Sequence, residues 1–333
     1  MNKSTFPLGS KRQLANNIWQ TVFEDNESFA SLYFDKIYTD KDTFLLTNQE
    51  GNQATVHLQA LPYQWKGGEC LYSAGYIAGV ATLPEYRGRG WASLLMQKAH
   101  TALIQRGNLL SFLLPASASL YRFYANKYGY TQTSLSIKNS LCSEQEWSKW
   151  HPIEDLDELD AYKRFTRYEE ELSHICQLPL HSLRQWRMIR ADLELAGGGV
   201  YTDGGMDYYL APQSNSDEKR SMVIRFSVPH QGSNFSLQSL SQPTPHGMIR
   251  ILNAPRILSL YPNLLPKHNR FFLTDNHLPH NRGWYVRTQK GQWIQTRRNQ
   301  TPAASTAPNI ISIEKLNQEL LSLYPALIFL MLE

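Results

Sequence analysis

Residues 80–96 restrict the possible folds of this chain more than any other segment. An apolar strand pattern ends at Leu83, a short turn rich in arginine and glycine follows, and a helical pattern begins at Trp91. The start of a helix carries unpaired N–H groups and the positive end of the helix dipole. These groups favour an anion, and the segment therefore predicts an anion site between a strand and a helix.

The turn itself has two features of a phosphate site. Gly88 and Gly90 allow the backbone to approach a ligand closely, because glycine has no Cβ. Arg87 and Arg89 add positive charges that can pair with phosphate oxygens. Together with the start of the helix, these residues suit a pyrophosphate.

Two common phosphate-binding loops do not fit these residues. A nucleotide-triphosphatase loop requires Lys-Ser or Lys-Thr after its glycines, and a dinucleotide fold requires a third glycine and an acidic residue about twenty positions later. Neither is present, and residues 102–105 contain no acid. A third pattern has Arg or Gln, then Gly three positions later, then Gly or Ala two positions after that. Arg87, Gly90 and Ala92 satisfy it. At this point the chain resembles the GCN5-related N-acetyltransferases (GNAT), in which that loop holds the pyrophosphate of coenzyme A.

The flanking residues agree with the order of elements in that family. Apolar spacing predicts helices at residues 14–23, 27–36, 91–106 and 119–127, and strands at residues 44–46, 55–61, 72–82, 109–114 and 131–138. The resemblance implies a mixed central sheet with flanking helices and acetyl-CoA as co-substrate. It implies cofactor contacts from Val80, Ala81, Thr82, Arg87, Gly88, Arg89, Gly90, Trp91 and Ala92.

A general acid is expected on the helix that follows the next strand. Family members place a tyrosine there, shortly before a Gly-aromatic pair. Tyr124 is the nearest match, although it lies six residues before Tyr130 where five is usual. Because of this offset, Tyr121 remains an alternative.

The general base is not found where many acetyltransferases carry it. An alkyl ammonium has a pKa of about 10.4 and must lose a proton before its nitrogen can attack. Residues 71–83, where many family members carry a carboxylate, contain no Asp or Glu. Residues 320–332 are nearly continuous apolar sequence before Glu333, and we expect them to be buried. This ending resembles the Eis-like acetyltransferases, in which the C-terminal carboxylate enters the active site. The resemblance implies that the Glu333 carboxylate is the base.

The Eis-like resemblance extends over the whole length and implies an α+β protein of three domains. Residues 1–139 would form the catalytic GNAT domain that binds acetyl-CoA. Residues 140–240 would form a degenerate GNAT-like domain without a cofactor site. Residues 241–333 would form a sterol-carrier-protein-like domain that ends in the active site; the matching segments are residues 246–253, 273–275, 281–285 and 311–316.

Cysteine and histidine usage predicts neither a disulfide framework nor a metal centre. The three cysteines, Cys70, Cys142 and Cys176, are odd in number and widely spaced, which is typical of reduced thiols. His277 and His280 have no Cys or second His pair near them, and a loop is the simpler interpretation. No apolar segment follows Met1, and residues 320–332 are too short for a membrane span. We therefore expect a cytoplasmic protein without a metal.

The acceptor is expected to be an amine. A net charge of +4 without a basic stripe of interleaved aromatics argues against nucleic acid as a partner. Polyamines, aminoglycosides and lysine side chains are the acceptors associated with the Eis-like branch, and an acidic pocket would suit any of them. The resemblance also implies a homo-oligomer, such as the hexamer that relatives form. The alternative hypothesis is a lipid- or peptide-binding protein in which coenzyme A is only a structural ligand.

Overall fold

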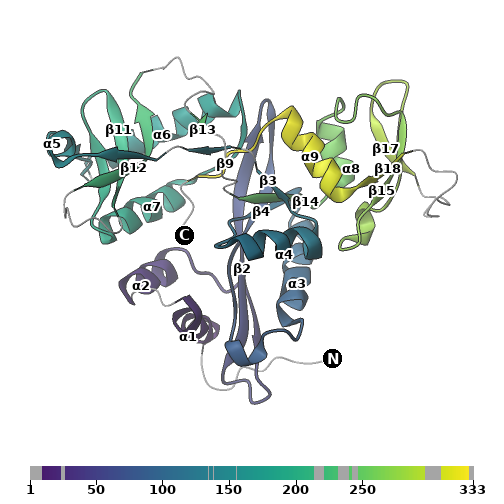
Figure 1. Cartoon of the computed structure of the whole chain (residues 1–333), viewed down its shortest axis with the longest axis horizontal. Coiled ribbons are helices and arrows are strands. Elements are labelled where there is room, and N and C mark those ends of the chain that lie inside the picture. Colours follow the sequence, from purple (N-terminus) through teal and green to yellow (C-terminus); the bar gives the residue numbers. More distant parts are fainter. Residues whose placement is uncertain are drawn as a thin grey trace.

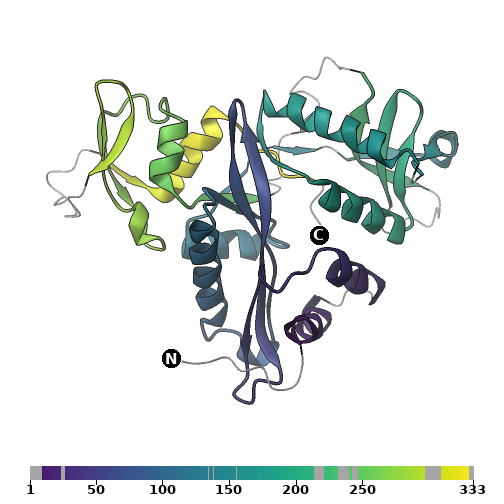
Figure 2. The same cartoon turned by 180° about the vertical axis from the view of Figure 1, so that it is seen from behind.

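The protein consists of three sheet-containing units arranged around a long central hairpin. The computed structural model describes residues 10–23, 27–133, 135–137, 139–154, 156–213, 221–231, 240–241, 247–296 and 309–329. The hairpin of β2 (Ala54–Gly67) and β3 (Cys70–Thr82) lies at the centre, with the second unit on one side and the C-terminal unit on the other (Figures 1 and 2). The first unit therefore contacts both of the others.

The first unit is a mixed sheet with helices on both faces. Its strand order is β1-β2-β3-β4-β14-β5, and β9 pairs with β2. The other strands are β1 (Thr43–Thr47), β4 (Leu110–Leu113), β5 (Thr131–Gln132), β9 (Gln177–Leu180) and β14 (Met248–Ile251). The pairing of β3 with β4 is parallel, and the other pairings are antiparallel. The expected α+β class, with a mixed sheet and flanking helices, is confirmed.

The helices of this unit divide between the two faces of the hairpin. Helices α1 (Lys11–Phe23) and α2 (Glu27–Lys36) lie on one side, and α3 (Trp91–Gln105) lies on the other (Figure 1). This division follows from the alternation of side chains along a strand. Val56 and Leu58 of β2 pack in the cluster that contains Leu95 of α3, whereas Leu61 packs with Trp19 of α1. Helix α4 (Ala118–Tyr128) follows β4.

The end of this sheet differs from the sequence prediction. The predicted strand at residues 131–138 is reduced to β5 and to β6 (Ser136–Ile137), and β6 pairs with β13 (Leu240–Ser241) instead. Strand β14, which was expected to begin the C-terminal domain, lies between β4 and β5. All four residues of β14 are buried, as a central strand covered on both faces requires.

The second unit is a five-stranded antiparallel sheet with the order β7-β12-β11-β10-β8. Its strands are β7 (Ser140–Cys142), β8 (His151–Pro152), β10 (Gly199–Thr202), β11 (Met206–Pro212) and β12 (Met222–Pro229). Its helices are α5 (Glu144–Trp147), α6 (Glu158–Ser173) and α7 (Leu183–Leu195). Ser182 begins α7 with a capping box, in which its side chain and that of Gln185 satisfy each other's backbone N–H.

The C-terminal unit has a four-stranded sheet with the order β17-β16-β15-β18. It comprises α8 (Ala254–Leu260), β15 (Arg270–Thr274), β16 (Gly283–Arg287), β17 (Trp293–Thr296), β18 (Ile310–Ser312) and α9 (Ile313–Leu323). No helix within the described ranges is both long and apolar enough to cross a membrane.

After α9 the chain returns to the second unit. Leu327 bridges to Leu135 and Ala326 bridges to Gln177. Ala326, Leu327, Ile328 and Phe329 are each at most 3% exposed. The expected burial of the apolar ending is therefore confirmed for Ala326 to Phe329, whereas Leu323 is 42% exposed. Residues 330–333, including Glu333, lie outside the described residues.

Candidate active site

Strands β3 and β4 separate from each other at the centre of the sheet. Their parallel pairing covers Ala74–Tyr76 of β3 and Leu110–Phe112 of β4. Strand β4 then ends at Leu113, whereas β3 continues to Thr82, where the described residues pair it with β2 alone. The last residues of β3 therefore have one edge at which backbone N–H and C=O groups can bind an extended ligand.

A β-bulge turns this part of β3. Gly79 and Val80 both lie opposite Leu58, because the register shifts between His57 and Gln59. Gly79 has φ +58, and a Cβ there would lie 2.4 Å from a ring carbon of Trp19. Burial lowers the pKa of His57 to about 4, so its ring is neutral at pH 7. Its Nδ1 donates a hydrogen bond of 2.6 Å to the Gly79 carbonyl, which holds the bulge in place.

The arginine-glycine turn has the conformation that an anion site needs. A short 3₁₀ turn, η1 (Pro84–Tyr86), follows β3. Gly88 and Gly90 have φ values of +75 and +78, and Gly90 begins α3 in the left-handed conformation. A Cβ at either glycine would meet no atom within 4 Å, so space is open beside the backbone. The turn and the first N–H groups of α3 thus fit a pyrophosphate.

The arginines and the remaining predicted contacts differ in their surroundings. Arg87 is exposed, and its Nε donates a hydrogen bond of 3.1 Å to the Thr82 carbonyl, so that the guanidinium lies at the end of β3. The Arg89 guanidinium lies 5.4 Å from the centre of the Tyr86 ring. Trp91 is 41% exposed at the start of α3, whereas the Ala81 side chain is buried. A contact from Ala81 to a ligand would therefore come from its backbone.

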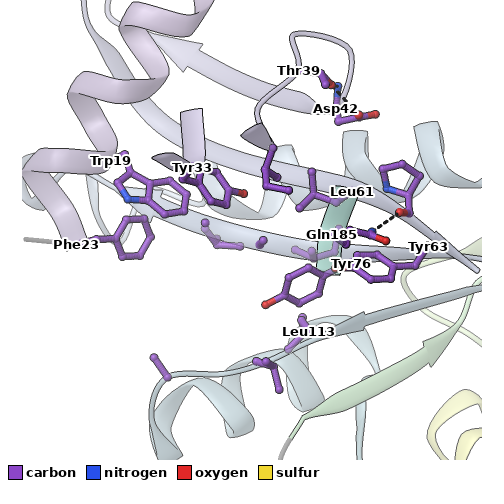
Figure 3. A pocket seen from close by; sticks show the side chains of 18 of the residues that line it. Trp19, Phe23, Tyr33, Thr39, Asp42, Leu61, Tyr63, Tyr76, Leu113 and Gln185 are labelled. Atoms are coloured by element: carbon purple, nitrogen blue, oxygen red, sulfur yellow. Dashed lines mark hydrogen bonds between the residues drawn. The ribbon is translucent and has the colours of Figure 1, made fainter. Parts of the chain in front are cut away.

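A cavity of about 690 Å³ opens where β3 and β4 separate (Figure 3). We call it the central cavity. Four consecutive residues of β3, from Ile77 to Val80, line one wall, and Leu113 to Ala116 line another. The remaining lining residues are Trp19, Phe23, Phe29, Tyr33, Ile37, Thr39, Lys41, Asp42, Leu61, Pro62, Tyr63, Tyr76, Leu120, Tyr121, Tyr124, Ser182, Arg184 and Gln185.

Both tyrosines proposed as the acid line the central cavity from α4. The Tyr124 side chain is 5% exposed and packs against the rings of Phe123, Tyr128 and Tyr130. Burial, with a smaller contribution from Tyr128, raises the pKa of Tyr124 above its ordinary value. The phenol is therefore protonated at neutral pH. Tyr121 lies one helical turn earlier, and the two alternatives remain open.

The second unit supplies residues that the sequence analysis did not find. Ser182, Arg184 and Gln185 line the central cavity from the first turn of α7, and Gln185 Nε2 donates a hydrogen bond of 3.2 Å to the Pro62 carbonyl. The Ser-x-x-Gln capping signal marked the helix start in the sequence. Because Gln185 and Pro62 are 123 positions apart in the chain, no local pattern could predict that the start of α7 lies at the cavity.

A buried ion pair supports the far end of α4. The Arg250 and Asp275 side chains are fully buried, and Arg250 Nη2 lies 2.7 and 2.8 Å from the two carboxylate oxygens. Asp275 also accepts hydrogen bonds from the backbone of His277 and from the Asn281 amide. Arg250 Nη1 in turn donates to the carbonyl of Tyr128, the last residue of α4. One arginine thus joins the first sheet, α4 and the C-terminal unit.

The cysteines are unpaired, and His277 and His280 contact other groups of the protein. All three cysteines are free thiols. His277 lies 2.9 Å from His100 between ring nitrogens, and His280 binds the Leu252 carbonyl at 2.7 Å. Within the described part of the chain, no group of three or more metal-ligating side chains is found.

Comparisons with known proteins agree with this geometry. Residues 9–133 match the family model described as "Acetyltransferase (GNAT) domain". The fold is similar to that of a probable N-acyltransferase from Enterococcus faecalis, with TM-score 0.62, 18% identity and coverage of 93% of this chain and 88% of that one. It is also similar to a GCN5-related N-acetyltransferase from Anabaena variabilis, with TM-score 0.65, 16% identity and coverage of 93% and 87%.

The crystal structure of Eis1 from Mycobacterium abscessus is similar over the same extent, with TM-score 0.62, 14% identity and coverage of 93% and 87%. No curated protein matches the chain significantly in sequence. At these identities the structural likeness establishes the fold, and the family model establishes the nature of the first unit. Residues 9–133 are a GNAT acetyltransferase domain.

Proposed function

We propose that this protein transfers the acetyl group of acetyl-CoA to a primary amine. The observation that carries the proposal is the central cavity, which opens between the separated ends of β3 and β4. Val80 of its lining lies on β3, the strand that leads to the Arg87–Ala92 turn and the start of α3. The pyrophosphate would lie on this turn and the first N–H groups of α3. The extended arm of the cofactor would follow the free edge of β3 from Val80 to Thr82. Its thioester would then face the amine within the cavity.

Direct attack needs a base and an acid. The amine nitrogen forms a bond to the acetyl carbonyl carbon while the carbon–sulfur bond breaks. In our proposal the Glu333 α-carboxylate accepts the first proton of the ammonium, and Tyr124 donates its proton to the departing sulfur. The second nitrogen proton, lost as the amide forms, then restores the Tyr124 phenol. The position of Tyr124 in the cavity lining supports the role of acid. The placement of Phe329, next to the His181 ring that contacts Tyr63 of the cavity wall, supports a base from the segment that follows.

The direct test is release of coenzyme A, detected with a thiol reagent, from acetyl-CoA and a panel of primary amines. Turnover with any amine would establish the activity. If calorimetry shows acetyl-CoA binding but no amine is acetylated, the alternative of a lipid- or peptide-binding protein with coenzyme A as a structural ligand would be favoured.

Replacing Arg87 with alanine should weaken acetyl-CoA binding by about tenfold or more, because a hydrogen bond to a charged group contributes about 1.5–3 kcal/mol. Turnover at saturating acetyl-CoA should change little. Calorimetry measures the effect, with Arg256→Ala, an exposed arginine of α8, as the matched control. Equal affinities of both variants would contradict the pyrophosphate assignment.

Adding residues after Glu333 should lower kcat by about 10²-fold or more, because the α-carboxylate becomes an amide and the base is lost. Affinity for acetyl-CoA should stay unchanged. The same extension at the N-terminus is one control. Glu333→Gln is a second, since it keeps the α-carboxylate and should keep turnover. Full turnover of the C-terminally extended protein would remove this carboxylate from the mechanism.

The finer domain assignments belong to the same proposal. The five-stranded sheet with α6 and α7 supports a degenerate GNAT-like domain at residues 140–240. The four-stranded sheet with α8 and α9 supports a sterol-carrier-protein-like domain at residues 241–333. We also propose a homo-oligomer, and sedimentation analysis would test both its existence and the hexamer that the resemblance implies.

A further inference from the structure

The acceptor side of the central cavity is built from aromatic and aliphatic side chains. Helices α1 and α2 provide Trp19 and Tyr33, whose rings stack with centroids 4.6 Å apart. The hairpin provides Tyr63 and Tyr76, which meet edge to face at 6.0 Å. Figure 3 shows the Trp19–Tyr33 pair and the Tyr63–Tyr76 pair on the wall that also carries Leu61. Such a wall binds an apolar body by removing its surface from water.

The charges on this wall do not favour a polycation. Asp42 is the one carboxylate among the described lining residues. Its side chain is 5% exposed and already lies 3.0 Å from the Arg106 guanidinium. Its second oxygen accepts a hydrogen bond of 2.6 Å from the Thr39 hydroxyl. A bound ammonium would therefore find this carboxylate already compensated.

Two exposed cationic side chains also line the central cavity. Lys41 lies next to Asp42, and Arg184 comes from the first turn of α7, where its Nε donates a hydrogen bond of 2.5 Å to the Lys36 carbonyl. The described lining thus carries two positive charges and one paired negative charge. A second ammonium on the acceptor would meet like charges, whereas a neutral or anionic group would not.

We infer that the acceptor is a monoamine with an aromatic or aliphatic body and a neutral or anionic far end, and not a polyamine or an aminoglycoside. This inference rests on the proposed function and gives its substrate class. The reactive ammonium itself would be met by the Glu333 α-carboxylate that we propose as the base, so that the described lining acts on the far end of the acceptor. The cavity volume of about 690 Å³ leaves room for such a body beside the acetyl group. The acidic pocket expected for polycationic acceptors is absent from the described lining.

Three linear amines of equal carbon number isolate the effect of the far end: hexylamine, 6-aminohexanoate and 1,6-diaminohexane. We expect kcat/KM for the first two to exceed that of the diamine by about tenfold or more, the range of a single uncompensated charge contact. An aromatic amine, 2-phenylethylamine, should be better than hexylamine. Equal or faster turnover of the diamine or of spermidine would overturn the inference while leaving the acetyltransferase activity established.

Reversing the charge of these two cationic residues provides a second test of the inference. In the double variant Lys41→Glu/Arg184→Glu, the preference for 6-aminohexanoate over 1,6-diaminohexane should reverse. The double variant Lys290→Glu/Arg256→Glu changes charge equally at exposed positions outside the cavity lining and should keep the wild-type preference. An unchanged preference in the first variant would show that these cations do not act on the acceptor.

Binding of the amines, measured by calorimetry with coenzyme A present, distinguishes the inference about the acceptor from the proposed transferase activity. Tighter binding of 2-phenylethylamine than of 1,6-diaminohexane without any turnover would support the nature of the cavity and contradict the transferase proposal. Tighter binding of the diamine would contradict the inference whether or not turnover occurs.

Discussion

Replacing Tyr124 with phenylalanine should lower kcat by about 10²-fold or more, the usual contribution of a general acid. The hydroxyl is the proton source for the departing sulfur in the proposed reaction. The ring would keep its packing against Phe123, Tyr128 and Tyr130, so the affinity for acetyl-CoA and the thermal midpoint should change little. Steady-state release of coenzyme A measures the effect.

Tyr121→Phe is the informative comparison because Tyr121 lines the same cavity one turn earlier on α4. If this variant loses turnover and Tyr124→Phe does not, Tyr121 is the acid. Tyr201→Phe, in β10 of the second unit, controls for the loss of a phenolic hydroxyl elsewhere. Full turnover of both α4 variants would mean that the proton comes from solvent.

Replacing Asp275 with asparagine should lower the free energy of unfolding by about 3–5 kcal/mol, the typical effect of breaking a buried ion pair. The variant leaves the fully buried Arg250 guanidinium without its compensating charge. It also weakens an acceptor for the His277 N–H and the Asn281 amide. Urea unfolding followed by circular dichroism measures the loss.

The exposed pair of Asp160 and Lys163 offers a matched control, since the side chains are 70% and 74% exposed. Asp160→Asn should change the free energy of unfolding far less than Asp275→Asn does. A loss at Asp275 as small as at Asp160 would show that the buried pair is not a major stabilising contact. Because Arg250 also binds the end of α4, Asp275→Asn should reduce turnover as well.

Local patterns in the sequence were sufficient for the helices of the first unit. The helical spacing at residues 14–23 and 91–106 depends on residues close together in the chain, and the structure has helices there. The arginine-glycine turn was also visible, because its chemistry and its position between a strand and a helix are both local.

The cavity wall and the order of the sheet could not be predicted in this way. The central cavity is lined by residues of three separate segments, among them Tyr33, Tyr63 and Arg184, which come together only when the chain folds. Residues 246–253 were recognised through the Eis-like resemblance, but a segment this short carries no information about which sheet it enters. Its place between β4 and β5 depends on pairings with residues more than 100 positions away.

This placement of β14 has a consequence for synthesis of the chain on the ribosome. The described part of the first unit begins at α1, but its sheet lacks an inner strand until Ile251 has been made. Until then the edge of β4 would remain open, and edges of this kind are prone to pair with other chains. The GNAT domain of this protein should therefore mature late in translation, together with the unit that follows it, and not as an independent N-terminal module.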